Sequence, residues 1–246
     1  LGAMLIQQPL FVSLEVGGNE VLGARGGLVA IPQIVEDPAV FAAQFDAIVA
    51  QVKAAQPQAA VLVGLPRDFS NVPGFRTGAE LWADRLTLLG GFHVDVNANC
   101  NGSVNLVTVP TIVVGTIGAG LQSKQGGGPP VPLSCADVPG QLDGILTPAD
   151  VRVLREVLAR MSSHIRRRAQ ENGWAYFDLG ALYGSPLIRP PFSAATLMTS
   201  LEPYGRYISR DGFHPSGLGQ AMLANAAAVA LNARYGLGLS STGGPW

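Results

Sequence analysis

Three short apolar runs divide the chain into an alternating pattern of predicted strands and helices. The runs cover residues 10–16, 59–64 and 174–178, and polar residues, glycine or proline bound them. Mainly apolar runs of this length are typical of strands that are covered on both faces, as in a parallel sheet. The pattern therefore predicts three buried strands. In open parallel sheets, ligands bind where the strands end, so functional residues are expected there.

Segments with helical periodicity lie between and after these runs. Asp37-Pro38 supplies an N-cap and a first-turn proline for a helix that we expect to run to about Gln56. The Thr-Pro-Ala-Asp motif at 147–150 predicts the start of a long second helix, which Gly173 would end. A third, alanine-rich helix is expected within 216–236. The apolar faces expected for the first two helices are Phe41, Phe45, Ile48 and Val52, and then Val151, Leu154, Leu158, Met161 and Ile165.

The segment from about residue 65 to 146 lacks regular periodicity, apart from a short predicted helix at Ala79–Leu88. A stretch of this length between regular elements usually has a binding or lid function. Because strand, helix and strand follow one another before it, the chain predicts a βαβ unit and a parallel sheet. We expect one α/β domain over residues 1–246, with a loop insertion at about 65–146. The apolar side chains of the insertion could line a ligand pocket or cover the sheet.

Composition excludes some classes of partner. The chain is 48% hydrophobic and 13% charged, with a net charge of −1. Nucleic acid is not expected as a partner, because no basic stripe is available to neutralise phosphates. No transmembrane segment is expected either, since the longest apolar stretch, 105–121, contains Pro110 and is too short to span a bilayer. His93 and His164 are expected to be ordinary histidines, with His164 on the polar side of its helix.

Cys100 and Cys135 flank a segment rich in glycine and proline. Two buried free thiols are one interpretation. The other, which we favour, is a disulfide that ties this segment down. Because disulfides persist in oxidising compartments, this second interpretation predicts an extracytoplasmic protein, whether secreted, periplasmic or a lipoprotein. No metal site is expected, since two cysteines without clustered histidines cannot complete a tetrahedral zinc shell.

The strongest candidate for chemistry is the segment Arg-Asp-Gly-Phe-His-Pro-Ser-Gly at 210–217. Asp211 lies three residues before His214 and can accept a hydrogen bond from one ring nitrogen. Such a bond fixes the tautomer and leaves the other nitrogen as a base. Pro215 fixes its own φ and biases His214 away from the helical region, so a rigid loop is expected to present the ring. Ser216 is expected to cap the helix that comes next and not to be a nucleophile.

A second candidate follows the first predicted strand, at Gly17-Gly18-Asn19. An Asn amide on a glycine-flanked turn can donate to a developing oxyanion, and such a donor contributes about 3–4 kcal/mol to catalysis. Taken alone, these residues could equally form a tight turn without a catalytic role. The Asp211/His214 pair after another strand favours the catalytic interpretation, because both segments would then lie at one edge of the sheet.

Together the two segments resemble the SGNH, or GDSL, family of serine esterases and lipases. Residues 17–20 correspond to the third block of that family and residues 211–215 to the fifth. Val-Leu-Gly at 21–23 is similar to the sequence that comes after the Asn motif in bacterial members. The likeness runs from about residue 10 to 237 and is loose in the insertion. Glu20 stands where the family usually has Asp.

The resemblance implies a three-layer α/β/α sandwich of the flavodoxin type and an ester hydrolase with a Ser-His-Asp triad. His214 would be the base and Asp211 its orienting partner, while Asn19 and Gly17 would belong to the oxyanion hole. The substrate would be a small-molecule or lipid ester, and no cofactor is implied.

The first two blocks of the family, which carry the nucleophilic serine in Gly-Asp-Ser and a glycine donor, do not occur in the chain. We expect both before Leu1, on N-terminal strands of which the first would be central in the sheet. The isolated chain would then be inactive and poorly stable. Two alternatives stay open: a non-catalytic binding module that has lost the nucleophile, and a carbohydrate O-deacetylase that uses the same residues.

Overall fold

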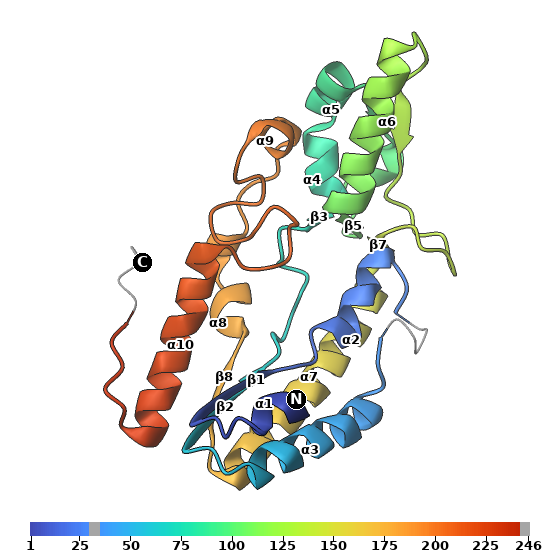
Figure 1. Cartoon of the computed structure of the whole chain (residues 1–246). Helices are drawn as coiled ribbons and strands as arrows, with labels where there is room; N and C mark the ends of the chain where they lie inside the picture. The colour runs from blue at the N-terminus through green and yellow to red at the C-terminus, as the bar shows by residue number, and fades with distance from the viewer. Residues whose placement is uncertain (30–34, 242–246) are drawn as a thin grey trace.

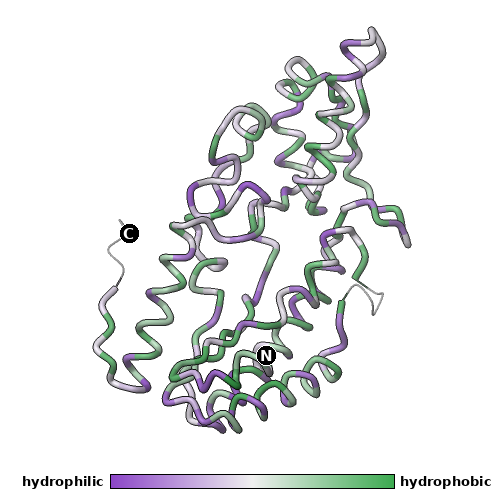
Figure 2. Tube along the Cα trace, viewed as in Figure 1, coloured by the Kyte–Doolittle hydropathy of each residue, from purple (hydrophilic) through white to green (hydrophobic). Residues whose placement is uncertain are grey.

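The computed structural model describes residues 1–29 and 35–241, without the side chain of Glu20. Its central element is a parallel sheet of three strands in the order β1-β2-β8 (Figure 1). These strands are β1 (Phe11–Glu15), β2 (Ala59–Gly64) and β8 (Ala175–Asp178). All three coincide with the apolar runs of the sequence, so their positions and the α/β class are confirmed, and Figure 2 shows β2 as a hydrophobic segment of the trace. The prediction that all three are buried is wrong for β1, where only Val12 of the five residues is buried.

Helices cover both faces of this sheet (Figure 1). On one face lie α3 (Pro38–Ala54) and α7 (Pro148–Asn172), and on the other lies α10 (Gly217–Tyr235). Within β2, Leu62 belongs to the core cluster that contains residues of α3 and α7, whereas Val61 packs in a cluster with Leu231 of α10. Successive side chains of a strand point to opposite faces, so an apolar strand such as β2 needs a helix on each side.

The three long helices begin and end where local sequence signals place them. The Asp37 side chain accepts a hydrogen bond from the Ala39 amide at the start of α3, and a complete capping box opens α7. Ser216 caps α10, and this helix and α7 both end at a glycine in the left-handed conformation. Capping side chains satisfy amides that have no partner inside the helix. One detail of the predicted faces is wrong, since α3 buries Val49 in place of Ile48.

The insertion is regular, which corrects the prediction of a loop. The predicted helix at 79–88 is two helices that meet at Asp84. The insertion contains β3 (Phe75–Thr77), α4 (Gly78–Ala83), α5 (Arg85–Phe92), β4 (Val94–Val96), β5 (Leu106–Thr108), α6 (Val114–Gln125), β6 (Val131–Leu133) and β7 (Ile145–Leu146). Figure 1 shows these elements beyond the carboxyl ends of β1, β2 and β8, and not across a face of the sheet.

Short strands and glycine-rich helices explain why the pattern did not predict the insertion. Its strands have two or three residues each, too few to show a period of two. Helix α6 contains three glycines, which are poor helix formers. One of them, Gly120, lies against the end of α5, because a Cβ there would be 2.4 Å from the carbonyl oxygen of Phe92. Close packing of two helices therefore requires a residue that local propensity argues against.

Cys100 and Cys135 form a disulfide, as predicted, and both are buried. The bond links a short 3-10 helix, Ala98–Cys100, to the segment after β6. A disulfide is compatible with an extracytoplasmic location. None of the described helices is long and apolar enough to cross a membrane.

The sequence pattern predicted His164 on the polar side of α7, and this prediction is wrong. Only 8% of its surface is exposed, and its Nε2 lies 2.7 Å from a carboxylate oxygen of Asp46 on α3. Its Nδ1 lies 2.7 Å from the Arg167 guanidinium. The histidine therefore joins the two helices on one face of the sheet, with a polar partner at each ring nitrogen.

Replacing both Cys100 and Cys135 by serine is expected to lower the free energy of unfolding. The disulfide spans 35 residues, and cross-linking a loop of that length contributes up to about 4 kcal/mol through the entropy of the unfolded chain. Urea unfolding followed by circular dichroism measures the loss. Wild-type protein treated with a reductant is the control and should unfold at the midpoint of the double variant. An unchanged midpoint in both would show that the bond does not stabilise the insertion.

Candidate active site

The loop before α10 folds around the carboxylate of Asp211. Its Oδ1 accepts hydrogen bonds from the amides of Phe213 at 2.9 Å and His214 at 3.0 Å, and from the Ser209 hydroxyl at 2.6 Å. Its Oδ2 contacts Nδ1 of the His214 ring. Gly212 has a φ of +82°, which completes the turn without strain because glycine has no Cβ. The pairing predicted from the Asp-x-x-His spacing is present.

Hydrogen bonds hold the Asp211 carboxylate in its ionised form. Partial burial raises the pKa of this carboxyl, but the bonds from Ser209, His214 and the two amides outweigh that effect and hold the pKa well below its usual range. An ionised Asp211 accepts from Nδ1–H, so the lone pair of neutral His214 is on Nε2. The pair is therefore arranged to make Nε2 a base.

The glycine-Asn turn after β1 is built for close packing. Gly17 has a φ of +116°, and a Cβ at this position would lie 2.9 Å from Leu65 Cδ1. Gly18 is the N-cap of α2 (Asn19–Leu22), so Asn19 is the first residue of that helix and is exposed. The backbone thus turns sharply at the end of the strand and presents Asn19 at the carboxyl edge of the sheet. The side chain of the neighbouring Glu20 lies outside the described part of the chain.

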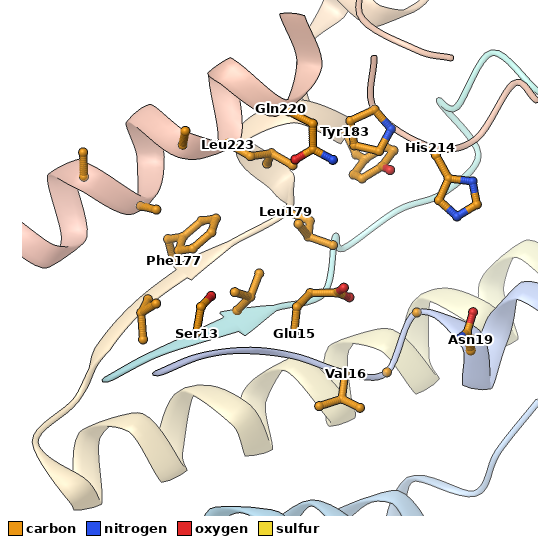
Figure 3. A pocket seen from close by; sticks show the side chains of 18 of the residues that line it. Ser13, Glu15, Val16, Asn19, Phe177, Leu179, Tyr183, His214, Gln220 and Leu223 are labelled. Carbon is orange, nitrogen blue, oxygen red and sulfur yellow. The ribbon is translucent and has the colours of Figure 1, made fainter. Parts of the chain in front are cut away.

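A pocket of about 650 Å³ brings these two segments together (Figure 3). Gly17, Asn19 and His214 line it, and Figure 3 shows His214 and Asn19 at the same end. The remainder of the lining is mainly apolar and comes from the sheet and the inner face of α10, including Val61, Val63, Phe177, Leu223, Ala227 and Leu231. The pocket therefore has one polar end with a base and an amide, and one long apolar part.

β1 contributes residues that sequence reasoning did not select. Phe11, Ser13 and Glu15 alternate along the strand and line the pocket. The alternation of these residues with Val12 and Leu14 is the signal that could have found them, because it places them on one face. Ser13 is mid-strand, and Figure 3 shows it farther from His214 than Glu15 is. Ser216 is occupied as the cap of α10.

Tyr183, on α8 (Gly180–Tyr183), lines the pocket and holds the loop of His214. Its hydroxyl donates to the carbonyl oxygen of Phe213 at 2.9 Å. Burial raises the pKa of this phenol, and the negative charges of Asp211 and Glu15 raise it further, so the hydroxyl stays protonated as a donor. No local motif indicates this role, since the bond joins residues 30 positions apart.

A second, more polar pocket lies at the carboxyl ends of β2 and β8. Asp68, Asn71 and Asp178 are in its lining. Both carboxylates have other partners, because Asp68 pairs with Arg155 at 2.5 Å and Asp178 accepts from the Gly180 amide at 2.9 Å. Among the described residues, no group of three His, Cys, Asp or Glu side chains is placed to hold a metal ion.

Comparison with known proteins adds no relative to this picture: no protein-family model, no curated protein and no solved structure matches the chain.

Asp211→Asn is expected to lower the free energy of unfolding at pH 7. A carboxyl whose folded-state pKa lies below the ordinary 3.8 stabilises the fold above that pH, and this contribution is lost as the pH falls through the folded-state pKa. The difference between variant and wild type should therefore shrink between pH 5 and pH 2, as measured by urea unfolding at several pH values. Asp95→Asn, on the exposed side of β4, is the control for loss of one carboxylate. A difference that stays constant with pH would contradict the role of the Asp211 charge.

Proposed function

We propose that this chain supplies the His-Asp pair and part of the oxyanion hole of a serine ester hydrolase of the SGNH type, whose nucleophilic serine lies in sequence before Leu1. The observation that carries the proposal is the Asp211–His214 pair at the polar end of the pocket that Asn19 also lines. An oriented imidazole and an amide donor at one end of an apolar pocket are the groups that acyl transfer requires.

Each described group has one role in the proposed reaction. Nε2 of His214 takes the proton of the serine hydroxyl as its oxygen attacks the ester carbonyl carbon. The Asn19 amide and backbone amides of the Gly17 turn donate to the oxyanion that forms. His214 then gives the proton to the leaving alcohol as the bond to the acyl carbon breaks. Water then attacks the carbonyl carbon of the acyl-serine as His214 takes its proton, and His214 returns the proton to the serine oxygen as the acid leaves. Asp211 stabilises the imidazolium in both steps.

The open edge of β1 supports this origin of the serine. Among the described strands, β1 pairs only with β2, so the backbone groups along its other edge point away from the sheet. A parallel strand added at this edge would end at the same side of the sheet as β1, next to Asn19 and the polar end of the pocket. A residue at the end of that strand would be delivered to His214. The helix or loop after the added strand would pack against the apolar part of the pocket, and a small-molecule or lipid ester would enter at the polar end.

The proposal predicts that a fluorophosphonate probe labels one serine in the parent protein, expressed with the sequence that precedes Leu1. The adduct, located by peptide mass spectrometry, should lie before Leu1 and should be lost in His214→Ala. His93→Asn is the matched control and should keep the adduct, because Asn tolerates the left-handed conformation that His93 adopts outside the site. An adduct within residues 1–246 would overturn the assigned nucleophile. No adduct at all would favour the non-catalytic binding module.

Asn19→Ala in the parent protein is expected to lower kcat by about 100-fold or more with little change in KM, because the lost donor stabilises charge that develops only in the transition state. Hydrolysis of p-nitrophenyl acetate measures both constants. Asn101→Ala is the control, since Asn101 is an exposed Asn in the insertion. Equal loss of activity in the two variants would remove Asn19 from the oxyanion hole.

A further inference from the structure

Backbone hydrogen bonds connect the segment after Asn19 to the insertion. The carbonyl oxygen of Gly26, at the end of the 3-10 helix η1 (Gly23–Gly26), accepts from the Gly144 amide at 2.9 Å. The carbonyl oxygen of Gly144 in turn accepts from the Thr108 amide at 2.9 Å. The hydroxyl of Thr108 also donates to the carbonyl oxygen of Arg25, at 2.6 Å. Thr108 is fully buried, so these bonds are shielded from water.

A second set of backbone hydrogen bonds connects the insertion to the loop of His214. The Val109 amide donates to the carbonyl oxygen of Gly74 at 2.8 Å. The Gly74 amide then donates to the carbonyl oxygen of Gly212 at 2.8 Å, two residues before His214. Because Thr108 and Val109 are adjacent, the two sets form one path from Gly26 to Gly212. The path runs through the antiparallel sheet β3-β5-β7 of the insertion.

The contacts along this path are too close for larger residues. A Cβ on Gly74 would lie 2.7 Å from the carbonyl oxygen of Gly212 and 2.8 Å from Cζ of Phe213. A Cβ on Gly144 would lie 2.4 Å from Cγ1 of Ile112. Arg25 also contacts the loop of His214 directly, because its guanidinium lies 5.8 Å from the centre of the Phe213 ring. Hydrogen bonds and close packing therefore attach both segments of the candidate site to the same small sheet.

We propose that this β3-β5-β7 bridge sets the separation between Asn19 and His214, and that Thr108 and Gly74 are positioning residues for the reaction. The inference rests on the proposed function, because the separation matters only if both side chains act on one substrate carbonyl. Thr108 acts through the Arg25 carbonyl on the segment of Asn19, and Gly74 acts through the Gly212 carbonyl on the loop of His214. The insertion then fixes the geometry of the site and is not a lid that opens and closes over it.

Thr108→Val tests the Asn19 side of the bridge in the parent protein. This variant keeps the shape of the side chain and removes the bond to Arg25, and a misplaced donor is expected to lower kcat by about tenfold with KM unchanged. Thr108→Ser restores the hydroxyl and should recover kcat to within about twofold of wild type. Thr116→Val is the matched control, because Thr116 makes a similar bond, to Ile112 at 2.7 Å, outside the bridge.

Gly74→Ala tests the His214 side. The added Cβ forces the Gly212 carbonyl and the Phe213 ring to move, so kcat is expected to fall by at least about tenfold while KM is kept. Gly118→Ala is the matched control, since a Cβ on Gly118 in α6 meets no atom within 4 Å. Urea unfolding of all five variants shows which of them remain folded under assay conditions. If the bridge variants and their controls lose kcat equally, or if Thr108→Ser fails to recover it, the positioning role is overturned.

A second readout separates this proposal from the proposed function. In NMR spectra of the parent protein, Thr108→Val and Gly74→Ala should shift the signals of the Asn19 side-chain amide and of the His214 ring, respectively, whereas Thr116→Val and Gly118→Ala should not. If the wild-type parent neither hydrolyses esters nor reacts with the fluorophosphonate, the proposed function fails whatever the bridge does. If the wild type is active but neither bridge variant shifts these signals, the bridge proposal alone fails.

Discussion

Hydrogen bonds along both edges of β2 hold the three-stranded sheet together, and the candidate site depends on that sheet. Within the described part of the chain, β2 alone of the three strands has a parallel partner along each edge, and its middle residues are almost completely buried. Because its neighbours run parallel to it, all three strands end at the same edge of the sheet. The turn with Asn19, the wall with Tyr183 and the loop before α10 are close to one another for that reason.

The insertion continues this arrangement at the edge where the strands end. It has its own antiparallel sheet and a disulfide, and it lies beyond the carboxyl ends of β1, β2 and β8 (Figure 1). Backbone hydrogen bonds at Gly26, Gly74, Gly144 and Gly212 connect it to the candidate site, and the rings of Phe75 and Phe213 also pack against each other. The surrounding atoms require glycine at two of these positions, because a Cβ on Gly74 would lie 2.7 Å from the carbonyl oxygen of Gly212 and a Cβ on Gly144 would lie 2.4 Å from Cγ1 of Ile112.

The pocket combines two environments that serve different purposes in the proposed enzyme. Its polar end contains an ionised carboxylate, an imidazole and an amide, all at the edge of the sheet. Its apolar part runs between β1 and the small residues on the inner face of α10. This apolar part lies beside the edge of β1 that pairs with no described strand, and such an edge can accept a further strand. The segment proposed before Leu1 would complete the polar end with its strand and cover the apolar part with the helix or loop that comes after that strand.

Local sequence signals were enough for the parts of the protein whose structure depends on near neighbours. The apolar runs at 59–64 and 174–178, the caps at Asp37 and Ser216, and the turn from Asp211 to His214 each involve residues within a few positions of one another. Only the tertiary structure decided the regular elements of the insertion and the buried position of His164. The same holds for the hydrogen bond from Tyr183 to the His214 loop and for the path through Thr108 and Gly74. These features depend on contacts between residues that are distant in sequence, some through backbone atoms that every residue has, and such contacts leave no periodic pattern along the chain.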